Sequence, residues 1–299
     1  MIYKRILYWL APLFFSFMVI VAIHMHFSGR NPLMVCYGKI CSLVAEFYFR
    51  KGDTSCSVEW MQVAADQGDF DAMFYVGCLH WIQKDLDKAR EWFEKAADKG
   101  YAPAMFNLGV LYQGQGKIAI AREWYKKAAN KGYADAMFNL GLLHSERGEV
   151  DYAIEWYKKA ADTGCEKATF NLGVIHYNKQ RDILNAIEWF QKAVDQGNVD
   201  AMLSLGILYA QQGDMDKAEK WYQKAAHQGN VDAKHNLGVL YTQQGNMDKA
   251  EEWYRKAADQ GNVYAMWNLA IVYRDKGDED KSMQWYQKAI DLGCVSNQE

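Results

Sequence analysis

The sequence predicts an all-α fold: an α-solenoid of about eight helix-turn-helix repeats of 32 residues, preceded by one transmembrane helix. Two observations support this prediction, a periodic tryptophan and an apolar run near the N-terminus. The periodic tryptophans, 32 residues apart except for one step of 33, are Trp60, Trp92, Trp124, Trp156, Trp189, Trp221, Trp253 and Trp285. A fixed period of this size is typical of stacked repeats that share one core.

The N-terminal segment is expected to hold a short cytoplasmic end, residues 1–5, and a transmembrane helix or signal anchor, residues 6–27. The second stretch contains no Asp, Glu, Lys or Arg. At about 1.5 Å per residue it is roughly 33 Å long, enough to cross a hydrocarbon layer of about 30 Å. Lys4 and Arg5 precede it, which favours a cytoplasmic N-terminus and places the repeats outside the cytoplasm. The alternative is a cleaved signal peptide and a secreted protein, although no Ala-x-Ala-like site follows the run.

The rest of the chain is divided into a linker, residues 28–39, a repeat domain, residues 40–296, and a tail, residues 297–299. The first repeat departs from the pattern, as terminal repeats often do. The fifth has one extra residue near Gln180–Asp182.

The last repeat ends at Gly293, and its second helix is expected to expose part of Trp285, Tyr286 or Ile290. This end either forms a homodimer or docks on another protein, or its polar residues leave it solvated; the sequence leaves these alternatives open.

Each repeat is predicted to contain two amphipathic helices. In the first helix, apolar residues such as Ala104 and Leu108 recur at spacings of three and four. Gly109 interrupts it, and because a mid-helix glycine costs about 1 kcal/mol relative to alanine, another helix is expected to approach closely there. The second helix carries Trp124 and Tyr125 on the face expected to fill the core, and it is expected to end at Gly132.

Two motifs carry a family resemblance: Ala-x3-Leu-Gly-x2-Tyr and Lys-Ala-x2-Trp-Tyr-x-Lys-Ala-Ala-x2-Gly. The first is complete from Ala233 to Tyr241, and the second from Lys217 to Gly229. They resemble the Sel1-like repeat family, close kin of the tetratricopeptide repeat, over about residues 40–296. The resemblance implies a bacterial protein that binds other proteins. The turn between helices is shorter than is usual in Sel1-like units, and the cysteine ladder of some secreted relatives is absent.

The charge distribution argues against a nucleic-acid partner. The net charge is -3, with +5 on residues 1–51 and therefore -8 on the remainder. A phosphate backbone requires clustered Lys and Arg, which an acidic solenoid does not provide.

No catalytic, cofactor-binding or metal-binding set is predicted, and the protein is expected not to be an enzyme. The sequence contains no Gly-x-Ser-x-Gly, Ser-x-x-Lys or His-Glu-x-x-His motif and no phosphate-binding loop. The alternative that the resemblance implies is a cell-wall or β-lactam hydrolase, as proposed for some cysteine-rich relatives.

Three histidines, His80, His144 and His176, lie at the position where other repeats have tyrosine. We interpret them as structural, because stacked helices about 8–10 Å apart do not bring such residues within about 2 Å of one zinc ion. The six cysteines permit disulfides in an exported domain, with Cys36–Cys41 the most local pair; six free thiols are the alternative.

The partner-binding residues are predicted on the first helices. If the repeats pack as tetratricopeptide arrays do, two positions four residues apart line the concave side. The predicted residues are Phe106, Val110, Phe138, Leu142, Phe170, Val174 and Trp267. An exposed apolar stripe would hold a peptide or a helix of a partner protein; the alternative is that superhelical winding buries it. The leading hypothesis is a membrane-anchored protein–protein interaction scaffold in the bacterial envelope, without a cofactor.

Overall fold

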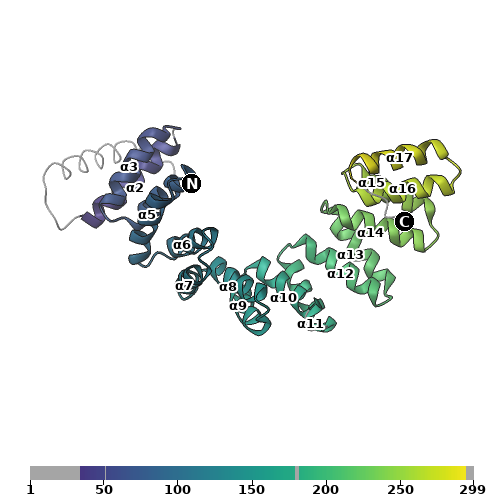
Figure 1. Ribbon diagram of the computed structural model, residues 1–299, viewed down its shortest axis with the longest axis horizontal. Helices are drawn as coiled ribbons and strands as arrows, with labels where there is room; N and C mark the ends of the chain where they lie inside the picture. The colour runs from purple at the N-terminus through teal and green to yellow at the C-terminus, as the bar shows by residue number, and fades with distance from the viewer. Residues whose placement is uncertain (1–33, 51, 179–181, 294–299) are drawn as a thin grey trace, which may run out of the picture. The chain divides into compact units, whose positions relative to one another are not determined.

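The computed structural model describes residues 34–50, 52–178 and 182–293, and all regular secondary structure in these ranges is α-helical (Figure 1). The sixteen described helices are α2 (Met34–Arg50), α3 (Thr54–Asp66), α4 (Phe70–Ile82), α5 (Leu86–Asp98), α6 (Ala102–Gly114), α7 (Ile118–Ala129), α8 (Ala134–Glu146), α9 (Val150–Asp162), α10 (Glu166–Asn178), α11 (Ile183–Asp195), α12 (Val199–Gln211), α13 (Met215–His227), α14 (Val231–Gln243), α15 (Met247–Ala258), α16 (Val263–Asp275) and α17 (Glu279–Asp291).

The chain divides into two units, residues 1–147 and 148–299. In unit 1, α2 pairs with α3, α4 with α5 and α6 with α7, and each second helix also packs on the first helix of the next pair. Unit 2 repeats this arrangement from α9 to α17. Within each unit, each helix therefore packs on its neighbours in chain order, which confirms the predicted α-solenoid.

The described chain begins with helix, because α2 starts at Met34; residues 34–39 of the expected linker are therefore helical. None of the helices in the described ranges combines the length and the hydrophobicity needed to cross a bilayer. The predicted membrane segment, residues 6–27, and the predicted tail, residues 297–299, lie outside the described residues.

Most helices begin with a polar side chain that accepts a hydrogen bond from a backbone N–H three residues on, as at Asp214 in α13 and Asn230 in α14. Helices end at glycines in the left-handed conformation. At the end of α7, for example, Gly132 has φ 84°, and the next N–H donates to the Ala128 carbonyl at 3.2 Å. Lys84 adopts the same conformation, φ 64°, in a turn where most repeats have glycine.

The helices approach each other most closely at the glycine of the first helix. A Cβ atom added to Gly109 would lie 2.4 Å from the ring of Tyr125, and one added to Gly206 would lie 2.5 Å from the ring of Tyr222. Real Cβ atoms do not approach ring atoms this closely, so the ring of the second helix requires the glycine. The predicted close approach is confirmed.

The two adjacent aromatic residues predicted to fill the core are not buried to the same extent. Tyr125, the residue after Trp124, is fully buried, whereas Trp124 is only half-buried. The same holds at Phe93, Tyr157, Phe190, Tyr222 and Tyr254 and the tryptophan that precedes each of them.

The tryptophans therefore line the edge of the core, because the glycine-sized space between the two helices accepts only the next ring along the helix. From Trp92 to Trp285, a lysine three residues on covers the exposed side of each periodic tryptophan; the Lys127 ammonium, for example, lies 3.9 Å from the Trp124 ring centroid.

The last repeat lacks the glycine. Ala270 replaces it, and the ring that would lie against it, Tyr286, is half-buried and packs edge-on against Trp267 with centroids 4.7 Å apart. Ile290 on α17 is 52% exposed. The expected exposure of this end is confirmed, and its role in dimerisation stays a prediction.

Candidate partner-binding site

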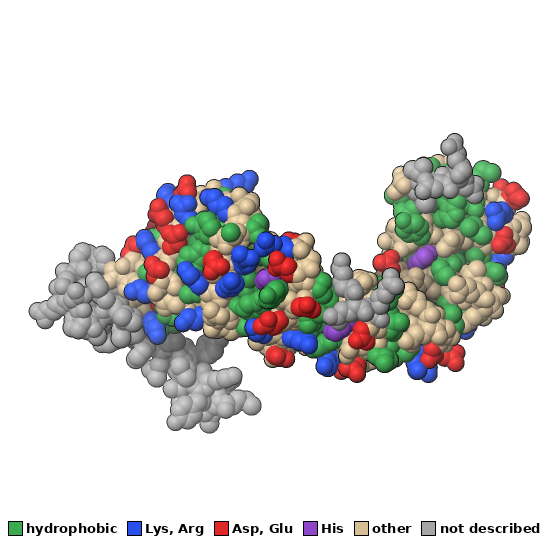
Figure 2. Space-filling model, turned by 60° about the horizontal axis from the view of Figure 1, so that its bottom comes forward, with side chains coloured by type: hydrophobic (Ala, Val, Ile, Leu, Met, Phe, Trp, Pro, Cys, Tyr) green, Lys and Arg blue, Asp and Glu red, His purple; other side chains and the backbone are tan. Residues whose placement is uncertain are grey.

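Each regular first helix presents two half-buried side chains four residues apart; we call the surface that they form in each unit the first-helix face. Its members in unit 1 are Phe74, Cys78, Phe106, Val110, Phe138 and Leu142. Its members in unit 2 are Phe170, Val174, Leu203, Ile207, His235, Val239, Trp267 and Ile271. All seven residues predicted to bind a partner belong to this face. On the side drawn in Figure 2, hydrophobic side chains lie at the surface among charged ones in both units.

The packing beneath this face explains why its residues are half-buried. The Phe106 ring lies 5.7 Å from the fully buried Tyr125 ring, and the Phe170 ring lies 5.5 Å from the Phe190 ring. Each phenylalanine thus covers the ring that fills the glycine gap and remains partly exposed, although Phe106 also contacts the Tyr133 ring, with centroids 5.3 Å apart. The two alternatives, an exposed stripe and an inner core, each describe one side of the same side chain.

A cavity of about 180 Å³ opens in the first-helix face of unit 2, between α10, α11 and α12. The predicted residue Val174 lines it together with Ile207 and Ser204. Pockets for drug-sized ligands measure roughly 300–1,000 Å³, so this cavity is suited to a single side chain. Its other lining residues are Tyr177, Asn178, Phe190 and Leu208.

The sequence analysis did not predict this cavity. Beside it, the Tyr177 hydroxyl donates a hydrogen bond to Gln211 of the next first helix at 2.9 Å. Neither feature has a signal in the repeat pattern.

A polar cluster lies further along the same face, between α14 and α16. His235 stands where four earlier repeats have phenylalanine, and its Nε2 accepts a hydrogen bond from the Asn268 amide at 3.1 Å. Burial lowers the pKa of His235, although Asn236 and Asp232 act in the opposite direction. Tyr264, 71% exposed, lies beside it with ring centroids 6.4 Å apart.

The structure distributes the predicted residues over several helices. In unit 1, Phe106 and Val110 lie on α6, and Phe138 and Leu142 lie on α8. In unit 2, Phe170 and Val174 lie on α10 and Trp267 lies on α16, with α12 and α14 between these two helices in chain order. Because of this separation, Trp267 and the cavity beside α10 are separate contact points.

The histidines at the tyrosine position lie on separate first helices, and no group of three metal-ligating side chains occurs among the described residues. His176 is 8% exposed, and neither ring nitrogen has a hydrogen-bond partner in the part of the chain that the structure describes. Cys56, Cys78 and Cys165 carry free thiols. The Cys36 side chain lies outside the described side chains, so its pairing with Cys41 stays a prediction.

Family models match most of the repeat domain. The Sel1 repeat model matches residues 49–69, 71–101 and 167–198, and tetratricopeptide repeat models match residues 106–164, 198–260 and 230–293. The chain therefore belongs to the Sel1-like and tetratricopeptide repeat proteins. No curated protein matches the sequence.

Solved structures share the fold. One is c5321, a protective antigen of uropathogenic Escherichia coli with an SLR fold: TM-score 0.68, 26% identity, 94% of this chain and 69% of that chain covered. Another is a Sel1 repeat protein from Oxalobacter formigenes: TM-score 0.69, 24% identity, 93% and 87% covered. A third is pilF of Pseudomonas aeruginosa: TM-score 0.54, 20% identity, 72% and 99% covered.

Proposed function

We propose that this protein is a scaffold for protein–protein interaction whose first-helix face holds a segment of a partner protein. Sel1-like and tetratricopeptide repeat proteins mediate protein–protein interactions through the surfaces that their stacked helices form. The observation that carries the proposal for this chain is the cavity of about 180 Å³ beside Val174 and Ile207. It provides a place for one apolar side chain of a partner segment, and the neighbouring half-buried residues extend the contact along the face.

Selection of peptides from a random library against the full-length protein tests this proposal. We expect selected peptides to share an apolar anchor residue and to lose at least ten-fold in affinity on Ile207→Glu, which places a charge at the cavity. Lys158→Glu is the matched control, because Lys158 is exposed on α9 and lies away from the cavity. A melting curve shows that each variant is folded. Peptides that bind both variants equally well would contradict the proposal.

We also propose that residues 6–27 anchor the protein in a membrane, with the repeats on the extracytoplasmic side of a bacterial envelope. The support is the uncharged stretch of 22 residues and the Lys4–Arg5 pair before it. Alkaline phosphatase fused to the C-terminus is expected to be active, since it matures only outside the cytoplasm. Activity of a cytoplasmic reporter at the same position would reject this topology, and an intact mass lacking the leader would reject the anchor.

A further inference from the structure

Helix α13 differs from the other second helices at the position before the tryptophan. Six repeats have glutamate there: Glu59, Glu91, Glu123, Glu155, Glu188 and Glu252. In α13 this residue is Lys220, so the charge at the position is reversed.

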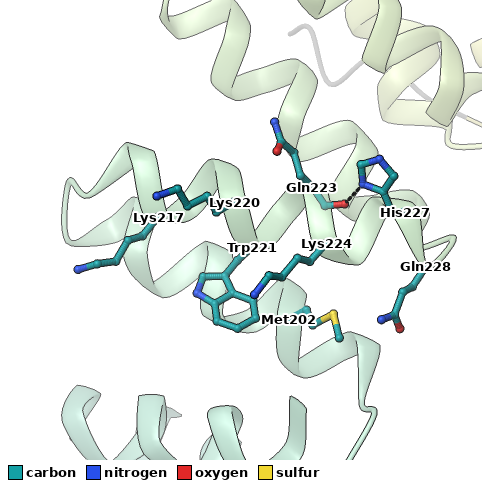
Figure 3. Close-up of a pocket in the computed structure, with 8 residues that line it drawn as sticks. All are labelled: Met202, Lys217, Lys220, Trp221, Gln223, Lys224, His227 and Gln228. Atoms are coloured by element: carbon teal, nitrogen blue, oxygen red, sulfur yellow. Dashed lines mark hydrogen bonds between the residues drawn. The ribbon is translucent and has the colours of Figure 1, made fainter. Parts of the chain in front are cut away.

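An open groove of about 650 Å³ lies at this helix (Figure 3). Its apolar part consists of Met202, 6% exposed, from α12 and the half-buried Trp221. Figure 3 shows the Lys217, Lys220 and Lys224 side chains on the same flank of α13 as the Trp221 ring. The groove therefore combines an apolar floor with three ammonium groups.

The three lysines are positioned to act together. They occupy positions i, i+3 and i+7, so they follow one face of α13 over about 10 Å. The Lys224 ammonium lies 4.0 Å from the Trp221 ring centroid, which fixes its place at the floor of the groove.

The carboxylates on or beside α13, including Asp216 in its first turn, form a salt bridge with only one of the three lysines among the described residues. Glu219 is turned toward α14, where it accepts hydrogen bonds from the Tyr241 hydroxyl at 2.5 Å and from Gln223 at 2.9 Å. Asp214 caps the helix and pairs with Lys217 at 2.8 Å. Among the described residues, neither Lys220 nor Lys224 forms a salt bridge.

The surroundings limit the kind of anion that fits. Residues 52–299 carry a net charge of -8, and the neighbouring second helices α11 and α15 keep glutamate at the position of Lys220. An extended polyanion, such as a bilayer surface or a nucleic acid, would meet these acidic neighbours on both sides. A short segment needs only the 10 Å or so that the lysines occupy.

We propose that the α13 groove binds a short acidic segment of a protein, with carboxylates paired to Lys220 and Lys224 and one apolar side chain against Met202 and Trp221. Lys217, paired with Asp214, lies at the same face and adds to the positive field. Exposed ion pairs are individually weak, so the affinity depends on the two pairs acting together with the apolar contact. This site lies on a second helix and does not depend on the first-helix face.

Fluorescence anisotropy with the full-length protein tests this proposal. The probe is a fluorescein-labelled peptide of twelve residues that contains Asp, Glu and one Leu; a peptide with Asn and Gln in place of the acids is its control. We expect micromolar binding of the acidic peptide, at least ten-fold weaker with Lys220→Glu and weaker in 300 mM than in 50 mM NaCl. Glutamate stands at this position in six other repeats, so the variant is expected to fold.

Lys158→Glu on α9 makes the same charge change away from the groove and is expected to leave binding unchanged. Equal weakening by both variants would mean general electrostatic attraction and would overturn the proposal. So would unaltered binding by the Lys220→Glu protein. Vesicles of phosphatidylglycerol and a single-stranded oligonucleotide are tested as alternative anionic ligands. Binding of either one without binding of the acidic peptide would also overturn the proposal.

Discussion

The two units use different side chains at the position that joins one repeat to the next. In unit 1, Tyr101 and Tyr133 precede α6 and α8 and make no capping hydrogen bond. In unit 2, the corresponding residues before α12, α14 and α16 are Asn198, Asn230 and Asn262, and each caps its helix. Asp69 before α4 of unit 1 caps its helix as the asparagines do. The same helix geometry is thus reached by aromatic packing before α6 and α8 and by hydrogen bonding before α4, α12, α14 and α16.

The partners of these joints show how the exchange works. The Tyr101 ring packs against Phe74 of the preceding repeat with centroids 5.4 Å apart; burial, together with a hydrogen bond to the Asp71 carboxylate, raises the pKa of Tyr101. The Asn230 amide instead donates to the Asp200 carboxylate at 3.3 Å. Asp71 and Asp200 occupy equivalent positions in their repeats. An aspartate at this position therefore accepts a hydrogen bond from the tyrosine in one joint and from the asparagine in the other.

The largest effect should be the same in both units, because the buried ring of the second helix is common to them. We expect Tyr125→Ala in unit 1 and Tyr254→Ala in unit 2 each to lower the free energy of unfolding by about 3–5 kcal/mol. Trp124→Ala and Trp253→Ala should cost only about half as much, since these rings are half-buried. Urea unfolding measures all four. If a Trp→Ala variant were less stable than the Tyr→Ala variant at the next position, the tryptophan would contribute more to the core than the tyrosine, which would contradict this expectation.

The glycine gap should also be equivalent in the two units. Gly109→Ala and Gly206→Ala place a Cβ atom within 2.5 Å of a ring, and we expect each to destabilise by about 2–3 kcal/mol. Gly114→Ala is the control, because no atom lies within 4 Å of its added Cβ and the change should stabilise α6 by up to about 1 kcal/mol. Thermal unfolding of the three variants checks the expectation, which fails if Gly109→Ala is neutral.

Substitutions at the joints should affect stability for different reasons at Tyr101, before α6, and at Asn230, before α14. Tyr101→Asn removes the ring contacts with Phe70 and Phe74 but offers a cap to α6, so we expect a net loss of about 1–2 kcal/mol. Asn230→Ala should cost about 1 kcal/mol through the lost cap. Hydrogen exchange of α6 and α14 locates each effect. A stabilised Tyr101→Asn protein would show that the aromatic joint has no packing role.

The smallest effect concerns pH in unit 2. Burial lowers the pKa of His235 below 6.5, so the unfolded chain binds a proton more readily than the folded one. Well above pH 6.5 His235 is neutral in both the folded and the unfolded chain, so its titration does not affect stability. As the pH falls through 6.5 toward the lowered pKa, the unfolded chain takes up the proton first, and the free energy of unfolding decreases. His235→Phe, which restores the residue found at this position in four other repeats, should lessen the loss between pH 7 and 5. Melting curves of the parent protein and the His235→Phe variant, recorded from pH 7 to pH 5, test this. A difference in melting temperature that stays constant with pH would contradict the expectation.

The sequence predicted much of the architecture because the repeat itself is a local signal. The helix end at Gly132 and the close approach at Gly109 both followed from residue preferences that are readable within one repeat. The face that contains Phe106 and Phe170 followed from the same period. The cavity beside Val174 did not, because it is formed by side chains from α10, α11 and α12, which only tertiary packing brings together.

The amino-acid sequence by itself determined the approximate number and the order of the helices in the repeat domain, since the 32-residue period and the glycines at helix ends are readable along the chain. Only the tertiary structure decided which aromatic residue occupies the centre. Trp124 and Tyr125 are adjacent and both apolar, yet neighbouring residues on a helix point about 100° apart, and only Tyr125 faces the glycine of the partner helix. The groove at α13 also became visible only in three dimensions, because helix packing brings Met202 of α12 against Trp221 of α13.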